Sequence, residues 1–373
     1  MSLPKKILYL HNSLAAGGGA EALRFTMLKY INKGKYDIRL CCLVRKGEIA
    51  EHIEKLGFYV DLLNVPDKIY SLGTIIKLYR YLHRNKFDIL QTAFFNVNFL
   101  GRIAGILAGV PKIIIEEHSY YERYNPRLGF ILRKVNRYLS KYTYKIIACA
   151  DVVAQRISSE ENIPMYKFCV IPNTVDQDRM KPGKNKEYLR KELNIKEGEV
   201  VIGFIASFAP RKGHIFLLNA IEECIKEVPK IKVFLVGAGM LKDKIAQMAK
   251  GKGLSEHFIF LGLRQDIPDI ISLLDIYVQP SLAEAFSISI TEAMSMGVPC
   301  IVTDVGGNRE IVGDDACGIF VPPRDPNALK NAIVKLAQDA ALRKRIGKSA
   351  AERVARVFNP QRYINSLEEL YDN

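Results

Sequence analysis

The sequence of 373 residues lacks the cysteine patterns and the long apolar runs that mark several classes of protein. Its seven cysteines form no Cys-x-x-Cys pair and no Cys/His ligand spacing, which argues against a disulfide framework and against a structural zinc site. The longest apolar stretch, residues 99–111, is interrupted by Arg102 and is too short to span a membrane. No basic segment followed by an apolar one opens the chain, so we expect no secretory leader and a cytoplasmic location.

What the sequence does contain is typical of a large globular protein. Hydrophobic residues make up 49% of the chain and charged residues 25%. A chain of this length exceeds one ordinary hydrophobic core, so it predicts two domains of roughly 150 to 200 residues each.

Positive charge is concentrated in the first half of the chain. Residues 1–180 hold 27 Lys and Arg against 16 Asp and Glu, so they carry +11 of the net charge of +14. Much of this excess lies in residues 120–145, where basic and apolar residues interleave as they do in a basic amphipathic helix. The basic positions are Arg127, Arg133, Lys134, Arg137, Lys141 and Lys145, and the apolar ones are Phe130, Ile131, Val135, Tyr138, Leu139 and Tyr142.

Two interpretations of this segment remain open. It could be a solvated helix that covers the domain core. It could also be a surface that binds the anionic lipids at the inner face of the cell membrane. Nucleic acid is not an expected partner, because no recognised binding motif accompanies the charge.

Short β-rich apolar runs alternate with longer segments of helical period along nearly the whole chain. This alternation predicts the α/β class, with parallel sheets whose strands are joined by crossover helices. The rhythm occurs twice, so two doubly wound sheets are expected. The predicted strands begin near residues 5, 36, 58, 88, 112, 145 and 168 in the first half and near 198, 230, 257, 275, 298 and 317 in the second.

A polar segment with Pro172, Pro182 and Gly183 separates the two halves. Its composition is that of an interdomain connection, and we expect the domain boundary near residue 180. Ligands of open parallel sheets bind beyond the carboxyl ends of the strands, so the loops that follow the strands are the candidate sites.

The first such loop contains Gly17, Gly18 and Gly19 before a predicted helix. Glycine lets backbone amides approach a phosphate, and a helix N-terminus favours its charge. Read as a dinucleotide fingerprint, the loop would imply a phosphorylated nicotinamide cofactor. Six residues separate it from the strand, however, and Arg45 ends the next strand where an acidic residue is expected, so that cofactor is not favoured.

A second loop follows the strand that begins near residue 198, where the chain turns into Arg211, Lys212 and Gly213 at the start of a helix. Two cations beside helix N-terminal amides suit a diphosphate, although a solvent-facing turn would have the same composition. Gly237, after the next strand, fits a tight turn as well as it fits a ligand contact.

Two glutamates, Glu284 and Glu292, follow the strand that begins near residue 275, the first in a loop and the second in a predicted helix. A carboxylate only accepts hydrogen bonds, so near a phosphate site it would repel the ligand unless it faces hydroxyl groups. Sugars supply such hydroxyls. Alone, the two glutamates would be taken as structural residues. Beside Lys212 they are predicted to bind the hydroxyls of two sugar rings, one on each side of a diphosphate.

Taken together, these motifs resemble glycosyltransferase family 4, the retaining enzymes of GT-B fold. The residues that carry the resemblance are Glu284, Glu292, Gly306, Gly307, Lys212, Gly213 and the junction at residues 171–176. The resemblance itself covers the whole chain. The resemblance implies two facing Rossmann-like domains with a central cleft. Residues 1–180 would hold mainly the acceptor, residues 181–355 mainly a nucleotide-sugar donor, and a C-terminal helix at 356–373 would cross back to the first domain.

The resemblance also implies which residues bind the donor. Glu292 would bind the ribose hydroxyls and Glu284 the donor sugar. The remaining sugar contacts would come from the backbone of Phe286, Ser287 and Ile288.

Other residues would face the diphosphate or the reacting carbon. The resemblance gives the first role to Gly17, Gly18, Gly19, Gly237 and Lys212. His118, which ends a predicted strand, matches a histidine that the family places near the donor sugar. Relatives commonly carry an arginine where this chain has Ser207, and Arg211 is the expected substitute.

The resemblance implies a retaining transfer with His118, Lys212 and Glu284 as the catalytic residues. No side chain is placed as a nucleophile, and the departing phosphate would assist the acceptor hydroxyl on the same face of the sugar. No cofactor or metal is expected, because the Asp-x-Asp string at Asp176 and Asp178 lies in the interdomain junction and not at a strand end.

The sequence therefore predicts a glycosyltransferase that moves a sugar from a nucleotide sugar to a glycan or lipid-linked acceptor, in cell-envelope or exopolysaccharide synthesis. Two alternatives share the architecture. One is a nucleotide-sugar epimerase, which would form product without an acceptor. The other is a non-catalytic peripheral membrane-binding protein with a vestigial sugar site.

Overall fold

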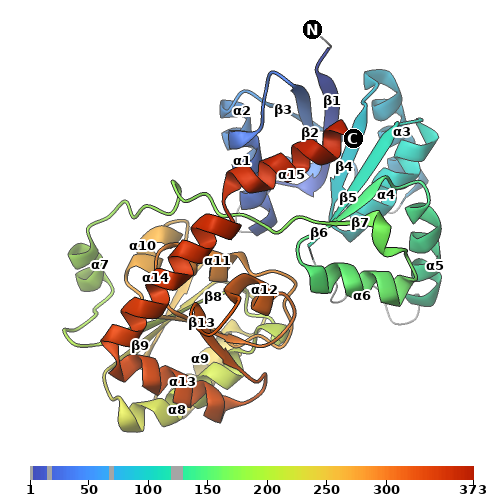
Figure 1. Cartoon of the computed structure of the whole chain (residues 1–373). Coiled ribbons are helices and arrows are strands. Elements are labelled where there is room, and N and C mark those ends of the chain that lie inside the picture. The colour runs from blue at the N-terminus through green and yellow to red at the C-terminus, as the bar shows by residue number, and fades with distance from the viewer. Residues whose placement is uncertain (1–2, 15–18, 67–70, 119–128) are drawn as a thin grey trace. The chain divides into compact units, whose positions relative to one another are not determined.

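The computed structural model describes residues 3–14, 19–66, 71–118 and 129–373 (Figure 1). The chain forms two compact units, residues 1–173 with 360–373 and residues 174–359. The boundaries predicted from the sequence were near residues 180 and 355. Each unit is described separately below.

The first unit is built on a sheet of seven parallel strands. The strands are β1 (Lys5–Ser13), β2 (Tyr36–Arg45), β3 (Tyr59–Leu62), β4 (Ile89–Ala93), β5 (Lys112–Glu117), β6 (Lys145–Ala148) and β7 (Phe168–Val170). Their order is β3-β2-β1-β4-β5-β6-β7, so the strand order reverses between β1 and β4. In doubly wound sheets ligands bind beyond the carboxyl ends of the strands at this reversal.

Helices connect the strands of the first unit. They are α1 (Gly19–Tyr30), α2 (Glu48–Lys55), α3 (Leu72–Asn85), α4 (Phe95–Leu107), α5 (Gly129–Ser140), α6 (Asp151–Glu161) and α15 (Pro360–Asp372), with a short 3-10 turn, η1 (Met165–Lys167). Both faces of the sheet are covered, which is why strands such as β1 are apolar at successive positions and not alternately. Ile7 and Tyr9 of β1 belong to one hydrophobic cluster, and Leu8 and Leu10 to another.

The basic segment predicted as one helix over residues 120–145 is shorter in the structure. Within the described residues it forms α5, which covers Gly129–Ser140. The helix ends at Ser140 and does not reach residue 145, where the sequence also predicts a strand and where β6 begins, in register with Ile114 of β5. Residues 120–128 of the prediction lie outside the described part of the chain.

The second unit contains a six-stranded parallel sheet of the same kind. Its strands are β8 (Val200–Ile205), β9 (Ile231–Val236), β10 (Phe258–Gly262), β11 (Ile276–Gln279), β12 (Cys300–Thr303) and β13 (Gly318–Val321), in the order β10-β9-β8-β11-β12-β13. Its helices are α7 (Lys186–Glu192), α8 (His214–Glu227), α9 (Lys242–Gly251), α10 (Ile267–Ser272), α11 (Ile288–Ser295), α12 (Asn308–Val312), α13 (Pro326–Gln338) and α14 (Ala340–Val357), with a 3-10 turn, η2 (Pro210–Lys212). The reversal of strand order lies between β8 and β11.

The two parallel sheets confirm the predicted fold class. The C-terminal helix α15 belongs to the first unit, where it lies beside α1 (Figure 1). Its apolar face is buried, through Tyr363, Ile364, Leu367, Leu370 and Tyr371. The seven cysteines are thiols, six of them buried and Cys169 half-buried. Within the described residues no helix is both long and apolar enough to cross a bilayer.

Candidate active site

The predicted Lys212 turn lies at the carboxyl end of β8 in the second unit. After β8 the chain forms the 3-10 turn η2, which Pro210 opens, and then enters α8 through Gly213. Gly213 has a φ of 73°, and a Cβ at this position would lie 2.0 Å from the carbonyl oxygen of Pro280. Only glycine allows this close approach, and the approach brings the β8 turn against the loop that follows β11.

Contact between these two loops brings Lys212 and Glu284 together. Lys212 Nζ lies 2.6 Å from Glu284 Oε1, and both side chains are largely buried, with exposed fractions of 12% and 5%. The backbone joins the loops as well, because the amide of Leu282 donates to the carbonyl of Arg211 at 2.7 Å. Burial lowers the pKa of Lys212, while the neighbouring Glu284 acts in the opposite direction.

Two further donors converge on the same oxygen of Glu284. Gln279 Nε2 and Ser281 Oγ each lie 2.7 Å from Glu284 Oε1. The phenol of Tyr277 in turn donates to Gln279 Oε1 at 2.7 Å, which fixes the orientation of the Gln279 amide. The carboxylate of Glu284 is therefore held in one position by buried polar groups.

Arg211 and Ser207 flank this ion pair. Arg211 Nη1 lies 3.9 Å from Glu284 Oε2, and its side chain is more exposed than that of Lys212. Ser207 is exposed, and its carbonyl accepts from the amide of Ala209 at 2.8 Å. Arg211 thus carries the second cation of the turn, while the position of Ser207 offers a hydroxyl at the surface.

The second glutamate of the pair lies on α11, which begins directly after the loop of Glu284. Ser287 is the N-cap of this helix and Ile288 its first residue, while Phe286 is buried against Phe358 with ring centroids 5.5 Å apart. Glu292 lies within α11, and within the described residues its carboxylate has no hydrogen-bond partner. Burial raises the pKa of Glu292 to about 7, although Arg179 opposes the shift.

Gly237 has a structural explanation of its own. It directly follows β9 with a φ of 137°, and a Cβ there would lie 2.1 Å from the carbonyl oxygen of Ala206. Gly239 approaches the backbone of Phe208 in the same way. These glycines let the loops after β8 and β9 pack closely, which is one of the two interpretations that the sequence left open.

The glycine loop of the first unit falls mostly outside the described residues. Gly17 and Gly18 are not among them, and Gly19 is the first residue of α1. Helix α1 carries Arg24, whose charged side chain is almost fully buried. Its guanidinium lies 4.0 Å from the centre of the Tyr9 ring and 2.6 Å, through Nη2, from Glu116 Oε1.

His118 directly follows β5 and is bonded to the same glutamate. His118 Nε2 lies 2.8 Å from Glu116 Oε2, and among the described residues Nδ1 of His118 is buried without a hydrogen-bond partner. Burial acts to raise the pKa of Glu116, but Arg24 and His118 outweigh it and hold that pKa well below its usual range. Glu116 is therefore an ionised carboxylate inside the unit, and it is compensated by a buried arginine.

Two more residues line this end of the sheet. His11 on β1 is buried, and neither of its ring nitrogens has a partner within the described residues. Burial and the charge of Arg24 lower the pKa of His11 to about 3, so its ring is neutral. Phe94 follows β4 with a φ of 72°, 38% exposed, and its ring centroid lies 6.0 Å from that of His118. A positive φ at a bulky residue is rare and is commonly found at functional sites.

Several of these residues were not predicted from the sequence. The missed residues are His11, Arg24, Gln91, Phe94, Glu116, Gln279 and Ser281. Glu116 carried one usable signal, because it stands two positions before His118 at a strand end. Arg24 and Phe94 carried none, since a basic residue in a helix and an aromatic residue after a strand occur in most proteins of this class.

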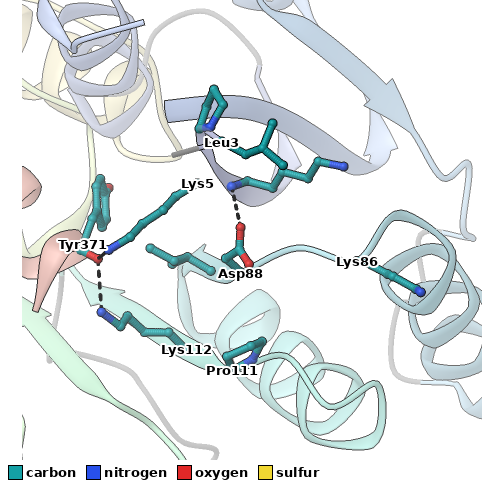
Figure 2. A pocket seen from close by; sticks show the side chains of 10 residues that line it. Leu3, Lys5, Lys86, Asp88, Pro111, Lys112 and Tyr371 are labelled. Carbon is teal, nitrogen blue, oxygen red and sulfur yellow. Dashed lines mark hydrogen bonds between the residues drawn. The ribbon is translucent and has the colours of Figure 1, made fainter. Parts of the chain in front are cut away.

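The first unit also contains a pocket at the amino ends of its strands, whereas Glu116 and His118 lie at the carboxyl end of β5. It is lined by the amino ends of β1, β4 and β5 and by Tyr371 of α15 (Figure 2). Lys5 Nζ and Lys112 Nζ donate to the carbonyl of Tyr371 at 2.9 and 3.1 Å. These lysines bind the last carbonyls of α15 and so fix the end of the C-terminal helix.

The Asp-x-Asp string is part of a turn in the structure. Asp176 is buried, and its Oδ1 accepts from the amide of Asp178 at 3.1 Å. Asp178 pairs with Lys181 at 2.8 Å. The described residues contain no group of three or more histidines, cysteines, aspartates or glutamates placed to hold a metal ion.

Two doubly wound parallel sheets, one in each unit, are the architecture of the GT-B fold. The profile described as Glycosyl transferases group 1 matches residues 185–353, and the profile described as Glycosyltransferase Family 4 matches residues 17–179. The chain belongs to this family, and the resemblance inferred from the sequence is confirmed.

Relatives and solved structures similar to the chain agree with this assignment. UDP-Gal:alpha-D-GlcNAc-diphosphoundecaprenol alpha-1,3-galactosyltransferase from Escherichia coli is 26% identical over 95% of this chain and 93% of its own. The putative glycosyltransferase EpsF of Bacillus subtilis is also 26% identical, over 81% of this chain and 80% of its own. The crystal structure of Anabaena HepE in complex with UDP and glucose has a TM-score of 0.86 at 22% identity, and it covers 99% of both chains.

Proposed function

We propose that the enzyme transfers a sugar from a nucleoside diphosphate sugar, with retention of configuration, to a lipid-linked or glycan acceptor in cell-envelope or exopolysaccharide synthesis. The observation that carries the proposal is the buried pair of Lys212 and Glu284 at the strand ends of the second unit. A fixed ammonium group suits a diphosphate, and a fixed carboxylate suits the hydroxyls of the sugar attached to it.

The proposed chemistry follows from the negative charge that develops on the diphosphate when the donor sugar is transferred. The bond from the anomeric carbon to the phosphate oxygen is lost, and the leaving diphosphate gains negative charge. Lys212, Arg211 and the first amides of α8 would stabilise that charge, which lowers the barrier. The acceptor oxygen bonds to the anomeric carbon on the face that the phosphate leaves, and its proton passes to the departing phosphate oxygen.

The acceptor class is supported by a relative and by the charge of the chain. The E. coli relative acts on a diphosphoundecaprenol-linked sugar, as its name states. Residues 1–180 of this chain carry a large positive excess, which suits an anionic lipid-linked acceptor. For the donor, HepE was crystallised with UDP and glucose, so UDP-sugars head the candidates.

Membrane association is part of the proposal and is supported by α5. Phe130, Ile131 and Tyr138 on this helix are 70%, 59% and 55% exposed, and Lys134 lies 4.3 Å above the Phe130 ring. The aromatic residues thus share an exposed surface with cations instead of covering the domain core. Such a surface suits the interface of an anionic membrane.

The test of the donor class is ligand-induced thermal stabilisation with UDP-, GDP-, ADP- and dTDP-sugars. We expect one nucleotide to raise the melting temperature and Glu292→Ala to abolish that rise. Exposed Glu197, which lies before β8, gives the matched control Glu197→Ala, which should keep it. Stabilisation by NADPH and by no nucleotide sugar would overturn the proposal.

A further inference from the structure

A chain of buried hydrogen bonds in the first unit connects the C-terminal helix to His118. Tyr371 Oη on α15 lies 2.6 Å from Gln91 Oε1 on β4, and Tyr9 Oη on β1 contacts Tyr371 Oη. The other end of the Gln91 amide contacts Glu116 Oε1, and Glu116 Oε2 lies 2.8 Å from His118 Nε2. These hydrogen bonds cross β1 and β4, between which the strand order reverses, and the neighbouring strand β5.

The direction of each hydrogen bond follows from Glu116. An ionised carboxylate only accepts, so Gln91 must present its Nε2 to Glu116 and its Oε1 to Tyr371. Tyr371 therefore donates to Gln91, and Tyr9 donates to Tyr371. At the other end His118 must donate through Nε2, which leaves Nδ1 as the nitrogen available to another group.

We propose that Glu116 is a positioning residue that keeps the proton of His118 on Nε2 and presents Nδ1 to the substrate, and that Tyr371 and Gln91 hold Glu116 in place. The inference rests on the proposed function only for the identity of the substrate. It assigns the end of the C-terminal helix a role in the reaction, beyond its packing against α1.

The geometry favours positioning over simple core packing. Glu116 accepts from three side chains on three different elements, Arg24, Gln91 and His118, so neither of its oxygens can turn without breaking a charge-assisted bond. His118 Nδ1 is buried, and within the described residues it has no partner. A buried ring nitrogen that is held in place and has no partner among the described residues is suited to a hydroxyl of a bound ligand.

The direct test is the nitrogen spectrum of the histidine rings in the folded full chain, with no sugar added. Long-range ¹H–¹⁵N correlation distinguishes a protonated Nε2 from a protonated Nδ1, and a His118→Asn variant assigns the signal. We expect the neutral ring of His118 to carry its proton on Nε2. A proton on Nδ1 in the unaltered protein would overturn the inference.

Glu116→Gln should reverse that arrangement. The amide oxygen of the new side chain must face the donors Arg24 and Gln91, so its NH₂ faces His118 Nε2 and forces the ring proton to Nδ1. Under the proposed function kcat should fall roughly 10- to 100-fold, as when the partner that orients a functional histidine is lost. A folded Glu116→Gln protein with the proton still on Nε2 would contradict the role of Glu116.

Because Glu116→Gln deprives buried Arg24 of its counter-charge and could prevent folding, a second variant keeps every charge. Tyr371→Phe removes the hydrogen bond to Gln91. It should broaden or double the His118 ring signals and lower kcat roughly tenfold. The matched control is Tyr36→Phe. It removes a phenol that donates to Asp372 of α15 at 3.0 Å but takes no part in the hydrogen bonds that lead to His118. Equal effects of the two variants would show that α15 acts only through packing.

These outcomes separate the inference from the proposed function. The ring spectra need no substrate, so they test positioning whether or not a nucleotide sugar binds. If a nucleotide sugar binds and is transferred while the spectra contradict the predicted tautomer, the proposed function stands and the role of Glu116 is lost.

Discussion

The ammonium group of Lys212 lies 2.6 Å from the Glu284 carboxylate, and this pair joins the loops that follow β8 and β11. The contact depends on Gly213, since any side chain there would collide with the carbonyl of Pro280. Because Gln279 and Ser281 hold the same carboxylate, the site is ordered by the protein itself. Preorganised charges of this kind act on a transition state without the cost of reorganisation.

Replacing Lys212 tests its role at the leaving group. Lys212→Ala should lower kcat by roughly 10²- to 10³-fold, because one charge that stabilises the leaving diphosphate is lost. Lys244→Ala, an exposed lysine on α9, is the control and should leave turnover unchanged. Steady-state kinetics with saturating donor and acceptor measure both, and an unaltered kcat in Lys212→Ala would refute the assignment.

The close approach at Gly213 predicts a large loss of stability on substitution. Gly213→Ala should lower the free energy of unfolding by at least about 2 kcal/mol, since its φ of 73° is unfavourable for alanine and the new Cβ meets a backbone atom. Gly183→Ala, where a Cβ meets open space, should be close to neutral. Calorimetric melting curves of the two variants give the comparison, and equal stability would contradict the packing described here.

Glu292 predicts a dependence of stability on pH. Burial raises its pKa in the folded protein to about 7, from an ordinary value of 4.5. Between these values the folded state retains a proton that the unfolded state has lost, so this residue makes stability fall as pH rises from 4.5 to 7. Glu292→Gln should remove that contribution and gain stability relative to the parent at pH 8 but not at pH 4.

Urea denaturation at the two pH values measures this effect. An equal shift at both would mean that Glu292 titrates in the folded protein as it does in water. Destabilisation at pH 8 alone would reverse the sign and would point to an ionised, paired Glu292.

We expect the protein to bind anionic vesicles through the exposed apolar and aromatic residues of α5, Phe130, Ile131 and Tyr138. Flotation at low salt should recover the protein with vesicles that contain phosphatidylglycerol, and added salt should weaken the binding. The double variant Phe130→Ser, Ile131→Ser should reduce recovery, whereas Tyr188→Ser on the second unit should not. No recovery of the parent protein at low salt would remove membrane association from the proposal.

Much of the fold could be predicted from the sequence because its strands are buried on both sides. Runs such as Ile7–Leu10 are then apolar throughout and stand out between helical segments. The placement of Lys212 and Glu284 at the same end of the second sheet was also predictable, because both follow predicted parallel strands. Their direct contact was not, because it depends on β8 and β11 being neighbours. The end of α5 at Ser140 was not, since basic and apolar residues continue to alternate beyond it as far as residue 145.

The network around Glu116 could not be predicted from the sequence. Its members come from β1, α1, β4, β5 and the last helix, and Tyr371 lies 280 residues from Gln91 in the chain. Only the strand order brings them together, and local sequence patterns carry no information on that order. Gln91 and Tyr371 each look like ordinary residues of a buried strand and a helix.

The measurement that tests the central claim most directly is acceptor-dependent transfer from the nucleotide sugar that stabilises the protein. The account predicts that nucleoside diphosphate is released only when a lipid-linked acceptor is present, and that the anomeric proton of the product shows by NMR the same configuration as the donor. Release of an altered sugar without acceptor would identify an epimerase instead, and a product of inverted configuration would contradict the retaining mechanism.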